Sequence, residues 1–351
     1  MKKSLIALAV MAAAGAASAQ SSVTLFGIVD AALTLGRGSV ADRTQMTDSG
    51  YNSSQIGFRG TEDLGGGMSA SFWLEAGINN DNGTGDTTSV NNQANTANVG
   101  LTFNRRSTVS LSGGWGELRL GRHFNPTFWN LAVFDPFGFN GVGTTQAATS
   151  VALYGPAGVR ASNKFEYFTP ANLGGFYGQA AYWLGENAET GAATEDDGNG
   201  WGARVGFASG PFNVALAYSR TEYAIGDSRT WNIGGQWDFG MARAMAHYTR
   251  DEGQFSAAGT EGRGWLIGAL VPVGPGEIRA SYSEYRIDGG TDPRSRKLAL
   301  GYVHNLSKRT AVYTTVAHVR NSNGASTALG GATTGAGDSS TGLDIGVRHA
   351  F

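Results

Sequence analysis

The sequence predicts an all-β protein, a sixteen-stranded antiparallel β-barrel that crosses a membrane. Three observations favour this fold: a glycine-rich composition, hydrophobic alternation with period two, and tight turns that alternate with long polar loops. Of the 351 residues, 54 are Gly and 41% are hydrophobic. Glycine disfavours helices, and a chain this apolar is not a disordered acidic one, so the composition favours strands.

Charge and cysteine content exclude several classes of function. The chain has 26 Lys and Arg against 28 Asp and Glu, and it has no Cys. A balanced chain offers no basic surface to a nucleic acid, so no nucleic-acid partner is expected. Thiolate metal sites, a Cys nucleophile and disulfides are excluded. No phosphate-binding loop joins a strand to a helix, so no cofactor is implied.

The N-terminus has the pattern of a secretory signal peptide. Two Lys residues precede an apolar run over 5–14, and the small residues Ala17-Ser18-Ala19 follow. We predict a signal peptide at 1–19, with cleavage before Gln20, and a barrel domain over 20–351. No later stretch has 18 uninterrupted apolar residues, so the exported chain is either soluble or a membrane barrel.

Hydrophobic residues alternate with polar or small ones along most segments. In 212–219 one face carries Phe, Val, Leu and Tyr, and the other carries Asn, Ala, Ala and Ser. In 231–239 aromatic residues stand at both ends of the apolar face. The segment 311–319 alternates too weakly for its faces to be assigned. Alternation predicts strands with one apolar face.

Turns and loops divide the chain into strands of a suitable length. Tight turns such as Ser209-Gly210-Pro211 are rich in Gly and Pro, whereas the other connections, such as 79–104, are long and polar. Each strand is close to the ~9–11 residues that a tilted strand needs to cross a bilayer. The expected strands are 23–34, 53–62, 68–79, 105–112, 116–123, 163–169, 175–185, 200–208, 212–222, 229–239, 241–250, 262–273, 276–287, 294–305, 310–320 and 342–351.

A soluble β-sandwich or a lipocalin-like barrel is the alternative fold. It would bury the apolar faces and would need a core sealed by loops. A membrane barrel turns its apolar face to lipid and its polar face to a water-filled lumen, and it places aromatic residues at both interfaces. The strand-end aromatics favour the membrane barrel. An even number of strands puts both termini on the periplasmic side, with the long loops outside.

Five segments resemble the Gram-negative porin family, in particular the trimeric, anion-selective porins of β-proteobacteria. They are Val23–Asp30, Gly57–Gly67, Arg105–Gly113, Gly116–Arg122 and Gly346–Phe351. The resemblance spans the whole mature chain. It implies a homotrimer in the outer membrane, in contact with membrane lipids and lipopolysaccharide, through which ions and small hydrophilic solutes diffuse. It also implies that the terminal Phe351 is read by the outer-membrane assembly machinery.

The longest internal loop, residues 124–162, follows the fifth strand. Its many Phe residues are too apolar for a free solvated loop. The resemblance implies that this third external loop folds into the barrel and narrows it. Asp135 is the one acid of the loop, and Arg160 is its one base.

Alternation along the strands selects wall residues that point into the lumen. Arg59 and Gln55 share one parity, opposite to that of the apolar Phe58. Arg119 is inward for the same reason, since it lies between two Leu residues. A diffusion channel needs such side chains to set the width and charge of its constriction.

The adjacent pair Arg105 and Arg106 is ambiguous. Alternation with Val109 and Leu111 predicts that Arg106 points inward, whereas the resemblance gives the pore-lining role to Arg105. A β-bulge or a strand end would reconcile the two. The resemblance also implies that Glu75 is an acidic constriction residue.

The sequence departs from the anion-selective pattern at two positions. The nearest relatives have Arg in place of Gln55 and near the position of Asn140, so a weak to moderate anion preference is expected. Asp30 and Arg122 are added as further candidates. The predicted constriction comprises Asp30, Gln55, Arg59, Glu75, Arg105, Arg106, Arg119, Arg122, Asp135 and Asn140.

Other functions remain as alternatives. A barrel protease would use Asp and His, and a phospholipase would use Ser, His and Asn. None of the five His residues lies in a nucleophile elbow or a metal-binding helix motif, so no catalytic residue is predicted. An adhesin would need a plugged lumen or a large external domain. A solute-specific channel stays open, although inward Tyr177 and Trp183 are few for an aromatic path. Adjacent acids at Asp196 and Asp197 are a weak candidate for divalent cations.

Overall fold

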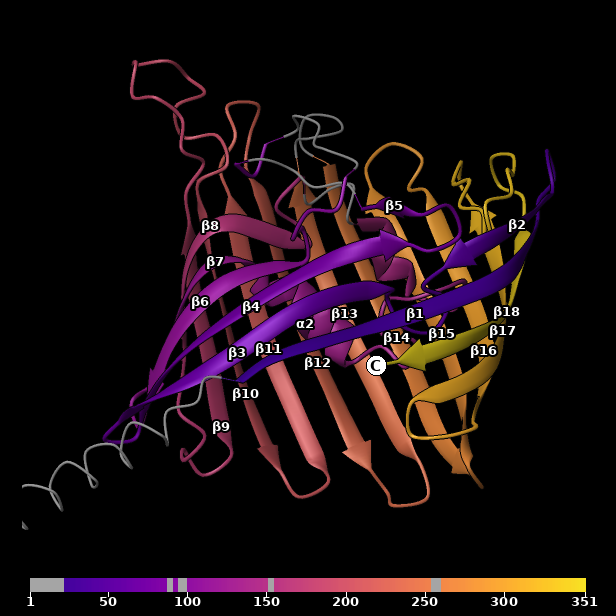
Figure 1. Cartoon of the computed structure of the whole chain (residues 1–351). Helices are drawn as coiled ribbons and strands as arrows, with labels where there is room; N and C mark the ends of the chain where they lie inside the picture. The colour runs from indigo at the N-terminus through magenta and orange to yellow at the C-terminus, as the bar shows by residue number, and fades with distance from the viewer. Residues whose placement is uncertain (1–21, 87–90, 94–99, 151–154, 254–259) are drawn as a thin grey trace, which may run out of the picture.

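A computed structural model describes residues 22–86, 91–93, 100–150, 155–253 and 260–351. One antiparallel sheet closes on itself to form a barrel (Figure 1). The first strand pairs with the last, from Ile28 opposite Ala350 to Arg37 opposite Thr341. Long loops gather at one end and short turns at the other (Figure 1). Closure leaves no unpaired sheet edge, which is the condition for strands to cross a bilayer.

The barrel consists of sixteen crossings, as the sequence predicts. The sheet has eighteen strands, but β2 and β3 both pair with β1 and together form one interrupted crossing. The two-residue strand β5 only pairs with the end of β4 and does not cross the barrel. The strands are β1 (Ser22–Arg37), β2 (Arg43–Asp48), β3 (Gln55–Gly65), β4 (Met68–Asn79), β5 (Thr84–Gly85), β6 (Arg106–Gly113), β7 (Gly116–Phe124), β8 (Arg160–Phe168), β9 (Phe176–Trp183), β10 (Gly200–Ser209), β11 (Phe212–Thr221), β12 (Ser228–Asp238), β13 (Arg243–Gly253), β14 (Thr260–Val273), β15 (Gly276–Asp288), β16 (Arg294–Asn305), β17 (Thr310–Ser322) and β18 (Ser340–Ala350).

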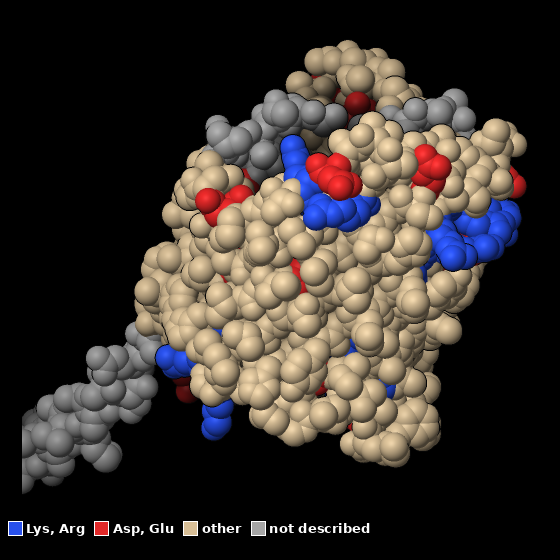
Figure 2. Space-filling model, turned by 90° about the vertical axis from the view of Figure 1, so that its right-hand side faces the viewer, with Lys and Arg blue, Asp and Glu red and all other residues tan. Residues whose placement is uncertain are grey.

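The outer surface is apolar between two rings of aromatic side chains. Toward the long loops, ring centroids lie 5.0 Å apart for Trp201 and Tyr218 and 5.4 Å apart for Trp231 and Tyr248. Toward the short turns, Phe212 and Trp237 lie 5.9 Å apart. Charged side chains gather near the loop end, and a broad uncharged band lies below them (Figure 2). This banding is typical of a barrel in lipid. Among the described helices, none is both long and apolar enough to cross a membrane.

The loop between β7 and β8 folds into the barrel. It contains the helix α2 (Pro126–Val133) and the 3-10 turn η1 (Gln146–Ser150). Asn125 caps α2, because its side chain accepts a hydrogen bond from Thr127 N, and Pro126 suits the first turn. The helix packs on β9 to β12 and the 3-10 turn on β14 to β16. We call residues 125–159 the inner loop.

Glycines on every second strand make room for the inner loop. A Cβ atom added at Gly234 would lie 2.2 Å from Phe134 Cδ2, and one at Gly268 would lie 2.6 Å from Pro136 Cγ. At Gly342 the Cβ would lie 2.7 Å from Val142 Cγ1. The same arrangement recurs at Gly202 on β10 and Gly301 on β16. These five glycines form a track along which the loop lies against the wall.

The structure of β17 explains why hydrophobic alternation is weak over residues 311–319. Its side chains alternate strictly, with Ala311, Tyr313, Ala317 and Val319 turned inward and buried. Ala317 and Val319 pack against Phe137 of the inner loop. The inner face is therefore largely apolar where the loop covers it, with Thr315 and Asn321 as its buried polar residues.

Candidate pore constriction

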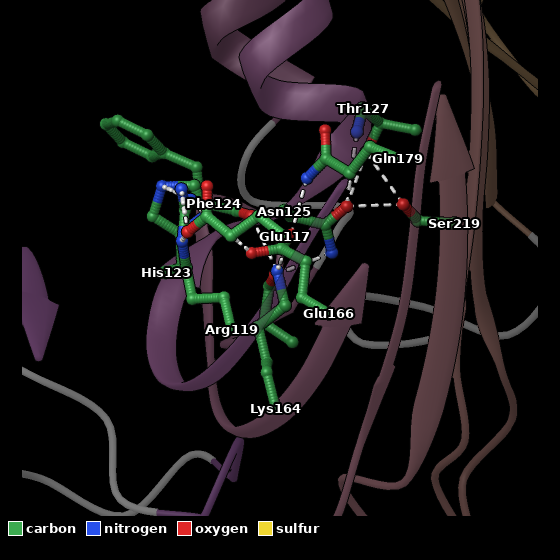
Figure 3. Close-up of polar contacts among 11 residues, drawn as sticks. Glu117, Arg119, His123, Phe124, Asn125, Thr127, Lys164, Glu166, Gln179 and Ser219 are labelled. Carbon is green, nitrogen blue, oxygen red and sulfur yellow. Dashed lines mark hydrogen bonds and ion pairs between the residues drawn. The ribbon is translucent and has the colours of Figure 1, made fainter. Parts of the chain in front are cut away.

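The root of the inner loop is fixed by a buried carboxylate (Figure 3). Glu166 on β8 is 1% exposed, and its Oε1 accepts a hydrogen bond of 2.9 Å from Lys164 Nζ. His123 Nδ1 lies 2.9 Å from Glu166 Oε2. Lys164 Nζ also donates to the carbonyl of Phe124, over 2.7 Å. A charge buried this deeply is stable only when it is paired, so the cluster locks the end of β7 to β8.

Arg119 belongs to the same cluster. It is on the inward face, as predicted, opposite Glu166 in the strand register. Its Nη2 lies 2.9 Å from Glu117 Oε1, and its Nη1 lies 3.8 Å from Glu166 Oε2. The side chain is 9% exposed. Arg119 is thus an inward cation whose charge two carboxylates offset.

The helix of the inner loop is held by buried amides. Asn130 Nδ2 donates to the carbonyl of Ala215 over 3.1 Å and to Asn232 Oδ1 over 2.8 Å. Its Oδ1 accepts a 2.9 Å bond from Arg204 Nε. Asn232 Nδ2 donates to the carbonyl of Thr127. Each of these amides would lose its partners if the helix left the wall, so the contacts position α2 firmly.

Asp135 shapes the tip of the inner loop. Its carboxylate accepts backbone hydrogen bonds from Phe137, Phe139 and Thr145, at 3.0, 3.2 and 3.0 Å. Burial raises the pKa of Asp135 above its usual value, and these backbone donors oppose the rise. The predicted acid of the loop is therefore buried, 4% exposed, rather than presented to the channel.

The opposite wall carries basic and aromatic side chains. Trp73 on β4 lies between Arg59 on β3 and Arg106 on β6 in the strand order. The guanidinium carbons lie 5.0 Å and 4.4 Å from the Trp73 ring centroid. Arg59 also lies 5.1 Å from the ring of Phe26, which packs edge-on against Trp73. Cation–π contacts of this kind orient a guanidinium while leaving its N–H groups free to bind anions.

The carboxylate of Glu75 lies beside these basic and aromatic side chains. Glu75 accepts hydrogen bonds from Arg105 Nε over 2.8 Å and from Trp73 Nε1 over 3.0 Å. Arg106 lies opposite Glu75 in the register, so alternation gave the right face for it. Arg105 lies just before β6, and its guanidinium reaches Glu75 from there. The strand end reconciles the two expectations. We call Arg59, Trp73, Glu75, Arg105 and Arg106 the basic cluster.

Gln55 and Asn140 both lie at the start of β3. Gln55 is on the face of β3 that also carries Arg59. Asn140 is at the tip of the inner loop, where its Oδ1 accepts a 2.9 Å bond from Ser53 Oγ. The structure thus brings the loop tip to the start of β3.

Asp30 lies apart from the basic cluster, whereas Arg122 lies beside it, because its Nε donates to the carbonyl of Asn104 over 2.5 Å. Asp30 is inward but fully buried, and its carboxylate accepts backbone hydrogen bonds from Tyr51 and Asn52. Arg122 lies opposite Ser107, on the parity opposite to Arg119. Its Nη1 donates to Ser162 Oγ over 2.8 Å. The first holds a chain segment and the second braces β7 against β8, so neither adds to the basic cluster.

Several inward charged residues were not among the constriction residues predicted from the sequence. The inner face also carries Lys164, Arg204, Arg279, Lys297 and Arg348. Alternation with Ile278 and Val347 was a usable signal for Arg279 and Arg348. Arg204 and Lys297, at 8% and 2% exposure, lie under the inner loop, and only the fold could show that.

The alternatives gain no support from the geometry. Across the described ranges, no group of three or more His, Cys, Asp or Glu residues could hold a metal ion. Asp196 accepts a hydrogen bond from Asn199 Nδ2 within its own loop, and Asp197 accepts one from Ala224 N of the loop between β11 and β12.

Comparison with known proteins decides the family. The profile of the Gram-negative porin family matches residues 5–324. Outer membrane porin protein 32 of Delftia acidovorans is 39% identical, with 100% of each chain covered. The chain belongs to the Gram-negative porin family. A solved anion-selective porin from Comamonas acidovorans shares 34% identity at a TM-score of 0.82, covering 95% of this chain and 100% of that one. An outer membrane porin of Bordetella pertussis is 29% identical, again with 100% of both chains covered.

The protein is therefore an outer-membrane porin. It is a channel for diffusion and not an enzyme. The sixteen-crossing barrel and the inward loop that the sequence predicted are both present. Width and charge of the passage between the inner loop and the basic cluster then become the functional variables.

Proposed function

We propose that this porin conducts ions and small hydrophilic solutes with a weak to moderate preference for anions. The observation that carries the proposal is the composition of the basic cluster. The cluster holds three guanidiniums and one carboxylate: Arg59 and Arg106 lie against the Trp73 ring, and Arg105 pairs with Glu75. The relative from Comamonas acidovorans is named an anion-selective porin, which supports the same sign.

The expected preference is modest for a physical reason. A tenfold selectivity corresponds to about 1.4 kcal/mol between anion and cation. Water in the passage screens the cluster, and Gln55 and Asn140 are neutral at the loop end of the passage. The cluster's surplus of two positive charges, screened in this way, would give a preference of a few-fold, decreasing as salt concentration rises.

Reversal potentials test the proposal. Purified protein in a planar bilayer with a KCl gradient is expected to favour Cl⁻. Arg59→Ala and Arg105→Ala should each reduce that preference, because each removes a cation from the cluster. Arg309→Ala is the matched control, since Arg309 is exposed in a turn. Equal permeability of K⁺ and Cl⁻ in the unaltered protein would contradict anion selectivity while leaving a porin.

We also propose that the porin is a homotrimer, in line with the family resemblance. The outward alanines Ala242, Ala244 and Ala246 on and beside β13 offer a small-residue face for a subunit contact. Ala244 and Ala246 are exposed in the single chain. Ala244→Cys in this Cys-free chain should give a trimer-sized crosslinked product. Monomer alone, from protein that still forms channels, would exclude this face.

The ends of the chain carry two further proposals. We propose that the leader 1–19, which lies outside the described residues, is removed on export, so that mass spectrometry of the mature protein finds Gln20 first. Phe351 pairs with Gly27 through two backbone hydrogen bonds of 3.0 and 3.1 Å and is 42% exposed. It is thus accessible to the assembly machinery. Removing Phe351 should reduce insertion in cells more than refolding in detergent.

Lipopolysaccharide is the proposed partner of the outer rim. Arginines such as Arg250 and Arg263 lie above the aromatic ring, at the end with long loops. Guanidiniums at that height suit the phosphates of a glycolipid. Co-purified lipopolysaccharide should be lost with Arg250→Ala combined with Arg263→Ala, and unchanged binding would exclude this rim.

A further inference from the structure

A cavity of about 300 Å³ lies between the tip of the inner loop and the barrel wall. Its walls come from segments that are distant in sequence: the loop tip at 141–144, the strands β1, β2, β16 and β18, and the connection between β17 and β18 at 328–330. Because that connection is one of the long loops, the cavity lies on the side of the loop tip that faces them. Its volume is at the lower end of the ~300–1,000 Å³ that is typical of small-molecule sites.

A buried ammonium group without a hydrogen-bond partner belongs to the wall of this cavity. Lys297 lies on the inward face of β16 and is 2% exposed. Within the described chain its Nζ has no hydrogen bond, and no carboxylate oxygen lies within 4.0 Å of it. An ammonium group removed from water is costly unless acceptors replace its hydration. Lys297 thus presents unused N–H groups to the cavity.

The charges around Lys297 decide which class of solute fits. The carboxylates of Asp135 and Asp344 both act on its ammonium group. Asp344 is held by donors of its own, because it accepts from Thr34 Oγ1 and from Val142 N, each over 2.8 Å. A carboxylate or a phosphate would be repelled by two negative charges, and a cation offers the ammonium group no acceptor. A neutral solute with acceptor oxygens remains.

The β2 side of the cavity offers acceptors. Gln45 is half-buried and donates from Nε2 to the carbonyl of Gly330 over 3.3 Å, and within the described chain its Oε1 has no partner. Asp48 accepts from the hydroxyl of its neighbour Ser49, which leaves carboxylate lone pairs for further donors. A solute that satisfies both sides must therefore accept hydrogen bonds from Lys297 and donate to β2. Hydroxyl groups do both, whereas a carboxylate only accepts.

We propose that this cavity, which we call the tip pocket, binds a small neutral polyol such as a monosaccharide. Lys297 donates to one hydroxyl oxygen of the polyol, while Gln45 and Asp48 accept from others. The aliphatic side chains of Val142 and Leu329 line the same cavity and suit the C–H face of a sugar ring. The tip pocket is separate from the basic cluster, which belongs to β3, β4 and the start of β6, so its ligand does not depend on the proposed anion preference.

Saturation-transfer NMR of the purified porin in detergent, with D-glucose as the probe, tests the proposal. We expect saturable transfer from the protein to glucose. Lys297→Met should weaken the apparent glucose affinity by about tenfold, since it removes a charged donor, and Gln45→Met should weaken it by about threefold, since it removes a neutral acceptor. Gln236→Met is the matched control, because Gln236 lies on β12 and does not line the tip pocket. It should leave glucose binding unchanged.

The second variant and a second solute separate binding from structure. Lys297→Met also removes the cation beside Asp135 and Asp344, whereas Gln45→Met loses only the 3.3 Å hydrogen bond to Gly330. Loss of glucose binding in Lys297→Met alone would therefore indicate a loosened loop and would overturn the site. Absent glucose transfer, or equal affinity in all variants, would also overturn it. Propionate is expected to show no binding that Lys297→Met removes, and such binding would reject a neutral ligand.

Discussion

The two sides of the barrel interior are built on opposite principles. Along β10 to β18, glycines and small side chains let the inner loop lie against the wall. Along β3, β4 and β6, long side chains such as Arg59, Trp73 and Arg106 extend into the passage. On the covered wall, small residues leave room for the inner loop, and the position of that loop sets the width of the passage. On the open wall, the charged side chains set the charge of the passage.

This division separates stability from selectivity. Contacts on the covered wall are buried and hydrogen-bonded, so changing them costs folding free energy. On the open wall Arg59 is exposed, so changing it alters ion preference with a small effect on folding, whereas Glu75 is 8% exposed and pairs with Arg105. Variants on each wall should therefore give different readouts.

The largest effect is expected at the glycine track. Gly234→Val would press on Phe134, whose Cδ2 lies 2.2 Å from the added Cβ. We expect a loss of about 1–3 kcal/mol in the free energy of unfolding and a lower single-channel conductance, because the loop moves toward the pore. Gly235→Val, on the outward face of the same strand, is the control, since its Cβ would approach Asn213 O only to 3.4 Å. Equal effects from both variants would reject the track.

A loss of similar size in the free energy of unfolding is expected at the buried amide of the inner loop. Asn130→Ala removes the acceptor of Arg204 Nε and the donor to Asn232 Oδ1, and we expect a cost of about 1–3 kcal/mol for these two buried groups. The loop should also open more often, which would appear as conductance noise. Denaturation monitored by gel mobility and single-channel recording provide the two measurements. A quiet channel of normal stability would show that α2 is held in another way.

The role of the open wall is tested by removing Glu75, the acid of the basic cluster. Glu75→Gln should raise the preference for Cl⁻, because the three guanidiniums of the basic cluster lose their opposing charge. The shift corresponds to about 1 kcal/mol at low salt and should vanish near 1 M KCl, where the Debye length is about 3 Å. Reversal potentials at two salt concentrations measure it. An unchanged reversal potential would place Glu75 outside the ion path.

The smallest effect is expected on the outer surface. Arg263 Nη2 lies 3.0 Å from Asp288 Oδ1, and both side chains are partly exposed. Arg263→Ala should change the free energy of unfolding by less than about 1 kcal/mol and should leave the reversal potential unchanged. A large change in ion preference would mean that charges at the rim also control the channel.

Strand prediction succeeded where alternation is local. The expected segments agree with the barrel strands to within a few residues, because each strand faces lipid on one side. β2 was missed: its residues, Arg43–Asp48, are mostly polar and precede a segment that leaves the sheet. The faces of β17 were hidden because the inner loop, distant in sequence, covers the inward side.

Site prediction succeeded in part for the same reason. Alternation placed Arg59, Arg106 and Arg119 on the inward face, but it could not tell that Glu117 and Glu166 offset the charge of Arg119. It also could not tell that Asp135 is buried by its own loop. A residue's position along its strand fixes whether its side chain points inward or outward. The ion pairs it makes depend on which residues of the neighbouring strands and of the inner loop lie close to it.

The sequence by itself determined the barrel and its number of crossings. These follow from period-two patterning against lipid, which is a local property of each strand. The tertiary structure alone decided which charges face water. It placed the loop on the glycine track, closed Asp30 behind residues 49–54, and brought Lys297 and Gln45 to the tip pocket. Those contacts join residues far apart in the chain, so no local pattern records them.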